Sequence, residues 1–123
     1  MNLLELTEKV VEMANKDEKF NENIKQTQAT IVMNLIDTKD TSLTFSINNG
    51  ELKFSQGKPE NFDFLFEISR KDFKELISRK NAEMMLMATK KLKMVEGSWT
   101  DIGKIVSTFG AIPKFSKEVV RSQ

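Results

Sequence analysis

Apolar residues recur at two different spacings in the first third of the chain, and each spacing predicts a different element. Residues 2–15 show the helical spacing and are expected to form an amphipathic helix. Residues 27–37 alternate instead, and both faces are partly apolar, which predicts a strand near the centre of a sheet. The polar residues between them, interrupted by Phe20 and Ile24, show neither pattern.

A β-hairpin over residues 43–56 is the clearest element in the sequence. Residues 43–48 alternate apolar and polar, and Asn49-Gly50 is the preferred pair for a two-residue type I′ turn. That turn would place Phe45 opposite Phe54, so that the apolar residues of both strands fall on one face. The turn chemistry and the alternation therefore predict the same hairpin.

The middle of the chain predicts one more strand, two helices and a last strand. Residues 62–68 alternate with three phenylalanines on one face, and Ser69 followed by Asp72 is a helix start signal. A break near Asn81 would separate this helix from a short methionine-rich one. Residues 90–96 then predict the last strand, which Gly97 ends.

Two helical segments are expected at the C-terminal end of the chain. Ser98 and Asp101 form another start signal, with Thr100 as the alternative cap, and the apolar residues up to Phe109 follow the helical period. Gly110 is predicted as the residue just beyond this helix, and Pro113 is expected to prevent its continuation. A terminal helix with an apolar edge would follow.

This order of elements predicts a single α+β domain over residues 1–123, with helices on one face of a mainly antiparallel sheet. Hydrophobic residues make up 39% of the chain and charged residues 30%, a balance that supports a real core in a soluble domain. The formal net charge of +1 gives no global field that would attract nucleic acid. No apolar run is long enough to span a bilayer.

The targeting signals and the residue types narrow the function further. The N-terminus mixes apolar and charged residues, unlike a secretory signal, and Arg121-Ser122-Gln123 does not match the peroxisomal address, so we expect a cytoplasmic protein. The sequence has no Cys, His or Tyr, which excludes disulfides, thiolate chemistry and imidazole catalysis. The remaining residue types, such as Asp, Glu and Lys, catalyse only where burial or neighbouring groups shift their pKa values. We expect no enzyme activity, no metal and no cofactor, and catalysis by a buried Lys or carboxylate is the alternative.

The ordered combination of these segments resembles the sterol carrier protein 2 domain family. The resemblance covers residues 20–110 and rests on the Asn49-Gly50 hairpin, the Gly57 loop, FDFLFEISRKDFKELI at 62–77, KKLKMVEG at 90–97 and the closing amphipathic helix. The chain departs from the family at Arg79-Lys80 and Ala88-Thr89, where many members have glycine.

The resemblance implies a five-stranded sheet with helices on one face and an apolar tunnel between the layers. It also implies non-catalytic binding and transfer of a fatty acid, a fatty acyl-CoA, a sterol or an isoprenoid-type lipid. Such domains occur fused to enzymes as non-catalytic modules. A lipid partner, at most transient membrane contact and no nucleic acid are the partners expected.

Methionines are unusually dense at residues 84–87, and this cluster is the first candidate for a ligand contact. Met84, Met85 and Met87 flank Leu86, and a short helix spreads four such neighbours around more than half its circumference. They cannot all enter one core, so some face a cavity, another helix, another chain or solvent. Ordinary core packing with one exposed methionine is the alternative.

The C-terminal apolar residues are the second candidate, because they could form a lid over a ligand. Gly110 and Pro113 give a break between two halves that carry these residues. Plain docking of a terminal helix on the core is the alternative. The full set of expected ligand contacts is Phe73, Ile77, Met84, Met85, Met87, Trp99, Ile105, Phe109, Ile112 and Phe115.

Two further alternatives follow from the same residues. An apolar groove could receive a partner helix, so that the domain serves interaction or oligomerisation, a homodimer included. Lys114, Lys117 and Arg121 recur at helical spacing and could meet anionic headgroups, although the near-zero net charge favours an ordinary solvated face.

Overall fold

A five-stranded mixed sheet forms one layer of the protein, which is described here by a computed structural model covering residues 1–122. The strands follow the spatial order β3-β2-β1-β4-β5, so β1 is central. β1 and β4 are parallel, and the other neighbouring pairs are antiparallel. The strands are β1 (Ala29–Leu35), β2 (Ser42–Asn48), β3 (Glu51–Gln56), β4 (Phe64–Ile68) and β5 (Lys93–Glu96).

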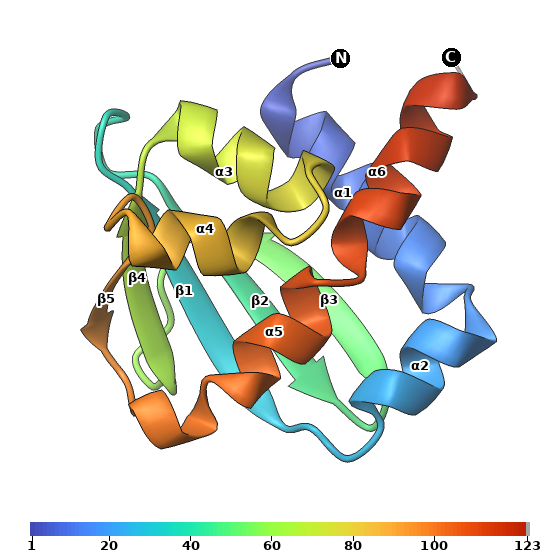
Figure 1. Cartoon of the computed structure of the whole chain (residues 1–123), viewed down its shortest axis with the longest axis horizontal. Helices are drawn as coiled ribbons and strands as arrows, with labels where there is room; N and C mark the ends of the chain where they lie inside the picture. Colours follow the sequence, from blue (N-terminus) through green and yellow to red (C-terminus); the bar gives the residue numbers. More distant parts are fainter. Residues whose placement is uncertain (123) are drawn as a thin grey trace.

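The helices cover one face of this sheet, as Figure 1 shows from the helical side. They are α1 (Leu3–Asn15), α2 (Glu18–Ile24), α3 (Arg70–Ser78), α4 (Ala82–Ala88), α5 (Gly103–Phe109) and α6 (Ile112–Arg121), with a 3-10 turn, η1, at Trp99–Asp101. α6 packs between α1 and α3, so the two ends of the chain lie side by side. The α+β prediction with helices on one face is confirmed. In residues 1–122 no helix is long and apolar enough to cross a membrane.

The predicted hairpin is confirmed in its register and in its turn. Phe45 lies opposite Phe54, and the pair ends at Asn48 opposite Glu51. Asn49 and Gly50 have φ angles of 54° and 77°, the left-handed values that a type I′ turn requires.

Aromatic rings fill the middle of the space between the sheet and the helices. The rings of Phe45 of β2 and Phe109 of α5 meet edge to face with centroids 5.2 Å apart. Its centroid lies 6.1 Å from that of Phe73 of α3, and all three side chains are almost fully buried. The region in which a tunnel was expected is therefore packed with side chains here.

α2 is an element that the sequence pattern did not reveal. The Asp17 carboxylate accepts a hydrogen bond of 2.8 Å from the Phe20 backbone N–H and caps the helix. Phe20 and Ile24, one turn apart, are both buried. Seven residues make fewer than two turns, so only this one apolar pair marked the helix.

Only one of the two serine residues predicted to start a helix caps an α-helix. Ser69 caps α3 as predicted, accepting a hydrogen bond of 3.1 Å from the Asp72 backbone N–H. Ser98 instead accepts from the Thr100 backbone N–H, two residues on, and the chain makes the 3-10 turn η1 before α5 begins.

The role predicted for Gly110 is wrong. Its φ of −63° is right-handed, whereas a residue that ends a helix in the expected way is left-handed. The chain turns through Gly110 and Ala111 and enters α6 with Pro113 in the first turn, a position where proline needs no N–H partner. Glycine fits because a Cβ here would stand 2.5 Å from the Val106 carbonyl oxygen.

Candidate functional site

A cleft of about 490 Å³ opens between α2 and α6, near the turn that joins α5 to α6. The buried side chains of Phe20, Pro113 and Phe115 form its floor. Exposed basic side chains stand around it, among them Lys80 and Lys117. Ligand pockets combine apolar side chains with polar groups that orient the ligand, and this cleft contains both.

Contacts between α2 and α6 hold this cleft in shape. The Phe20 and Phe115 rings meet edge to face with centroids 5.6 Å apart. Lys114 Nζ lies 3.6 Å from an oxygen of Asp17, the cap of α2, and 5.5 Å from the centroid of the Phe115 ring. One lysine therefore links the helix cap to the aromatic floor.

The rim of the cleft carries more positive than negative charge. Its five basic residues, Lys19, Lys80, Lys114, Lys117 and Arg121, face two acidic ones, Asp17 and Glu118. The hydrogen bond from the Phe20 N–H holds the pKa of Asp17 below its usual value, and the charge of Lys114 acts in the same direction. Asp17 pairs with Lys114, and the remaining basic residues, Lys19, Lys80, Lys117 and Arg121, outnumber the remaining acidic residue, Glu118.

A buried carboxylate lies behind the wall of the cleft. Glu83 of α4 is 2% exposed, and within residues 1–122 its Oε2 has no hydrogen-bond partner. Its Oε1 would be 3.5 Å from a Cβ placed on Gly110, which lines the cleft. No pattern in the sequence indicates that Glu83 is buried. No group of three or more Asp, Glu, His or Cys in the described residues could hold a metal ion.

The structure divides the expected ligand contacts into a buried and a more exposed group. The buried residues are Phe73, Ile77, Ile105, Phe109, Ile112 and Phe115, each at most 3% exposed. They lie in one core, and Phe115 also lines the cleft. Their contact with a ligand remains a prediction.

The more exposed expected contacts lie on α4 and at η1. Met84 is 57% exposed, Met85 38% and Trp99 63%, whereas Met87 is half-buried against the core. Leu86 is fully buried, so the four neighbours diverge around the short helix as its geometry requires. Whether these methionines contact a ligand stays a prediction, as does the lid over it.

The comparisons with known proteins agree with this architecture. The family model for the SCP-2 sterol transfer family matches residues 8–102. A crystal structure of sterol carrier protein 2 is similar at 11% identity with a TM-score of 0.71, covering 92% of this chain and 94% of that one. The apo form of sterol carrier protein 2 from Yarrowia lipolytica is 24% identical with a TM-score of 0.52, covering 88% and 84%.

An enzyme also contains a similar fold. The inverting sec-alkylsulfatase Pisa1 from Pseudomonas sp. is 16% identical with a TM-score of 0.61, and the match covers 75% of this chain but 14% of the enzyme. At these identities the structural likeness shows the fold alone. The comparison with curated proteins finds no match.

Proposed function

This chain belongs to the SCP-2 sterol transfer family, and from that premise we propose that it binds and transfers an apolar ligand. The candidate ligands are a fatty acid, a fatty acyl-CoA, a sterol or an isoprenoid-type lipid. The observation that carries the proposal is the cleft between α2 and α6, whose floor, formed by Phe20 and Phe115, is continuous with the core.

The apolar part of the ligand enters over the Phe20–Phe115 contact and toward the space between the layers. Each buried CH₂ group contributes about 0.8 kcal/mol, so a long chain binds well without polar contacts. Because Phe45, Phe73 and Phe109 fill that space, entry requires the helices to move apart. The turn at Gly110 and Ala111 between α5 and α6 is where such a movement would be absorbed.

The polar end of the ligand stays at the rim, among Lys80, Lys117 and Arg121. This favours an acidic headgroup, a carboxylate or a phosphate, over a neutral one. Among the four ligand classes, fatty acids and acyl-CoA esters fit the rim better than sterols. We expect the ligand to be carried and not converted, as the non-catalytic role of the family implies, and the chain also offers neither an imidazole nor a thiol.

A variant that fills the cleft tests the proposal without changing any side chain of the core. Ala111→Trp places an indole on the half-buried wall of the cleft, and Ala88→Trp places one on the exposed end of α4 as a matched control. The delipidated proteins are titrated with a fluorescent long-chain fatty acid. Ala111→Trp should bind it about tenfold more weakly than the wild type, a loss of about 1.4 kcal/mol in binding free energy, and Ala88→Trp should bind it like the wild type. Circular dichroism and melting temperature establish that both variants fold.

Two results would overturn this function. One is equal fatty acid binding by Ala111→Trp and Ala88→Trp. The other is a protein that copurifies with no lipid in native mass spectrometry and whose melting temperature no long-chain lipid shifts.

An interaction module is the second candidate function, and the exposure of Met84 and Met85 favours it. Surface methionines adapt to the irregular face of a partner helix or of a second copy of the chain. Concentration-dependent assembly, with residues 84–87 protected from oxidation in the oligomer alone, would support this function over lipid transfer.

A further inference from the structure

Basic residues are concentrated on the outer surface of α3 and α6, where three neighbouring hollows share them. Beside the cleft lies a hollow of about 630 Å³ that shares Lys80 and Lys117 with it. A third hollow, where α1 and α3 begin, shares Lys71 and Lys74 with the second. The three hollows therefore form one continuous surface along the helical layer.

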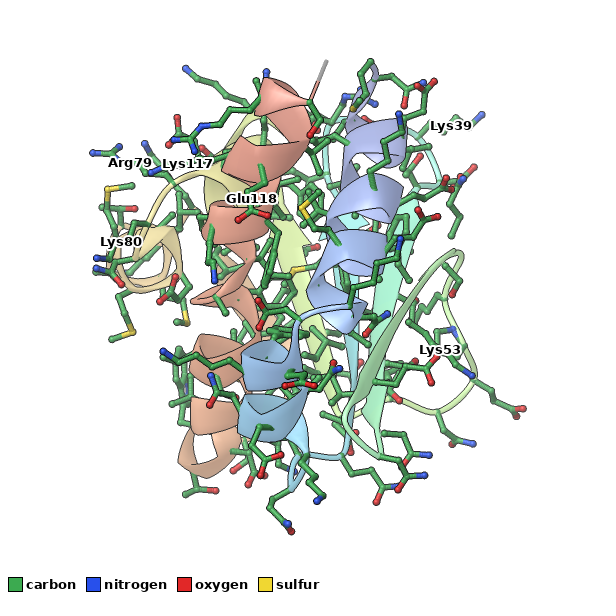
Figure 2. The ribbon with its side chains drawn as sticks, turned by 90° about the vertical axis from the view of Figure 1, so that its right-hand side faces the viewer. Lys39, Lys53, Arg79, Lys80, Lys117 and Glu118 are labelled. Atoms are coloured by element: carbon green, nitrogen blue, oxygen red, sulfur yellow. The ribbon has the colours of Figure 1, made fainter. Side chains whose placement is uncertain are left out.

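We call this surface the basic face and define it by Arg70, Lys71, Lys74, Arg79, Lys80, Lys114, Lys117 and Arg121. These eight are a large share of the 19 basic residues in a chain whose net charge is +1. Figure 2 shows Arg79, Lys80 and Lys117 gathered on the helical side, while Lys39 and Lys53 lie on the sheet side.

Internal ion pairs do not account for the basic face. Glu75 lies 3.7 Å from Arg79, an exposed pair of the kind that contributes little, and Asp17 lies 3.6 Å from Lys114. The acidic residues Asp17, Glu75 and Glu118 line the same hollows, and the basic residues outnumber them. In the described part of the chain Lys74, Lys80 and Lys117 make no ion pair. Like charges held together on one surface repel each other, and an external anionic partner would relieve that repulsion.

Exposed apolar side chains flank the basic face. Met84 and Met85, both exposed, lie on α4, which begins two residues after Lys80, and Val120, 59% exposed, lines the third hollow together with Lys71 and Lys74. Basic side chains beside exposed apolar ones have the chemistry of a lipid interface, because the cations meet headgroup phosphates while the apolar groups enter the acyl boundary. A nucleic acid would match the charges but not these apolar residues.

From this combination we propose that the basic face docks on the surface of an anionic lipid bilayer. α1 is not the docking element, because it exposes Glu5, Glu8 and Glu12 to solvent. Docking through Lys80 and Lys117 places the mouth of the α2–α6 cleft at the membrane, where a ligand leaves or enters the bilayer. The docking step itself does not depend on any ligand in the cleft.

Charge reversal on opposite sides of the molecule tests the proposal. Lys74→Glu/Lys117→Glu reverses two charges of the basic face, and Lys39→Glu/Lys53→Glu makes the same change in net charge on the sheet side. Delipidated protein is sedimented with vesicles of phosphatidylcholine, with or without phosphatidylserine, at low and at physiological salt. The wild type should sediment with the phosphatidylserine vesicles alone and be released by salt.

The two double variants should differ in vesicle binding. Each reversed charge on the basic face should lower the partition coefficient of the protein onto anionic vesicles severalfold. Lys74→Glu/Lys117→Glu should therefore bind these vesicles at least about tenfold more weakly than the wild type. Lys39→Glu/Lys53→Glu should retain most of the wild-type affinity. Met84→Gln/Met85→Gln should weaken the binding that remains at physiological salt. Equal losses in the two double variants, no binding to anionic vesicles at low salt, or tighter binding to single-stranded nucleic acid than to vesicles would each overturn the proposal.

Discussion

The edge of one phenylalanine ring meets the face of another where α2 packs on α6, since Phe20 and Phe115 lie 5.6 Å apart at 80°. Both side chains are nearly fully buried, yet both line the cleft. The same contact therefore closes the core and forms the floor of the candidate site.

Truncating Phe115 should destabilise the protein and open the floor of the cleft. Phe115→Ala should lower the free energy of unfolding by about 3–5 kcal/mol, and Phe115→Leu by less, because leucine leaves a smaller void. Urea denaturation followed by circular dichroism measures both. A double-mutant cycle with Phe20→Leu should give a coupling of about 0.5–1.5 kcal/mol, and a coupling near zero would contradict the ring–ring contact.

Asn15 holds the end of α1 against the edge strand β3, and its removal should loosen that edge. Its Nδ2 donates to the Leu52 carbonyl at 2.6 Å, and its Oδ1 accepts from the Leu52 N–H at 2.9 Å. Asn15→Ala should cost about 1–3 kcal/mol, because both backbone groups of a buried residue lose their partner. The Leu52 amide should also exchange its hydrogen faster.

Asn23→Ala is the matched control for this asparagine, because Asn23 is exposed on α2. Its effect on unfolding should stay within about 0.5 kcal/mol. Similar losses in the two variants would mean that the paired hydrogen bonds to Leu52 are not what stabilises the edge.

The hairpin and the central strand could be predicted because their signals are local. An Asn-Gly pair fixes its own turn, and the alternation around it fixes the register that places Phe45 opposite Phe54. The prediction for Gly110 was wrong because the role of this glycine depends on packing and not on a local signal. Glycine at a helix end is usually chosen for a left-handed φ, but here close packing on the Val106 carbonyl requires it, and packing distance leaves no trace in sequence spacing.

The candidate site was predicted less well because distant segments form it. Phe115 was expected to contact ligand, but its neighbours Asp17 and Phe20 come from a helix almost a hundred residues earlier that showed no clear pattern. No periodicity reports which side of a short helix reaches solvent, and Met84 and Met85 do so here. Only the fold brings Lys80 next to Lys117.

Asp17 should make stability depend on pH in the acidic range. Its pKa is held below the usual value of 3.8, first by the Phe20 N–H and then by Lys114. A carboxyl group with a lowered folded-state pKa stabilises the protein above its ordinary pKa, and this contribution is lost as the pH falls through the folded-state pKa. Asp17→Asn keeps a capping oxygen but removes the charge, so its melting temperature should lie below that of the wild type at pH 6.

The difference in melting temperature should shrink as the pH falls below 3.8 and vanish once Asp17 is protonated in the folded protein. In a Lys114→Met background the difference at pH 6 should be smaller but still present, because the Phe20 N–H remains. A difference that does not change with pH would show that the charge of Asp17 plays no part.

Glu83 should be a residue whose replacement stabilises the protein. A carboxylate that is 2% exposed, with an oxygen lacking a partner among residues 1–122, has lost its hydration without full compensation. Glu83→Gln keeps the shape and removes the charge, and Glu83→Met replaces it with an apolar side chain of high helix propensity. We expect the free energy of unfolding to rise by about 1–3 kcal/mol, measured by urea denaturation.

Glu75→Gln is the control, because Glu75 is an accessible glutamate on α3 whose pair with Arg79 is exposed. That change should stay within about 0.5 kcal/mol. If Glu83→Gln destabilised the protein instead, the carboxylate would have a stabilising partner in solution. Glu83→Gln should also leave vesicle binding by the basic face unchanged, because the buried carboxylate does not reach that surface.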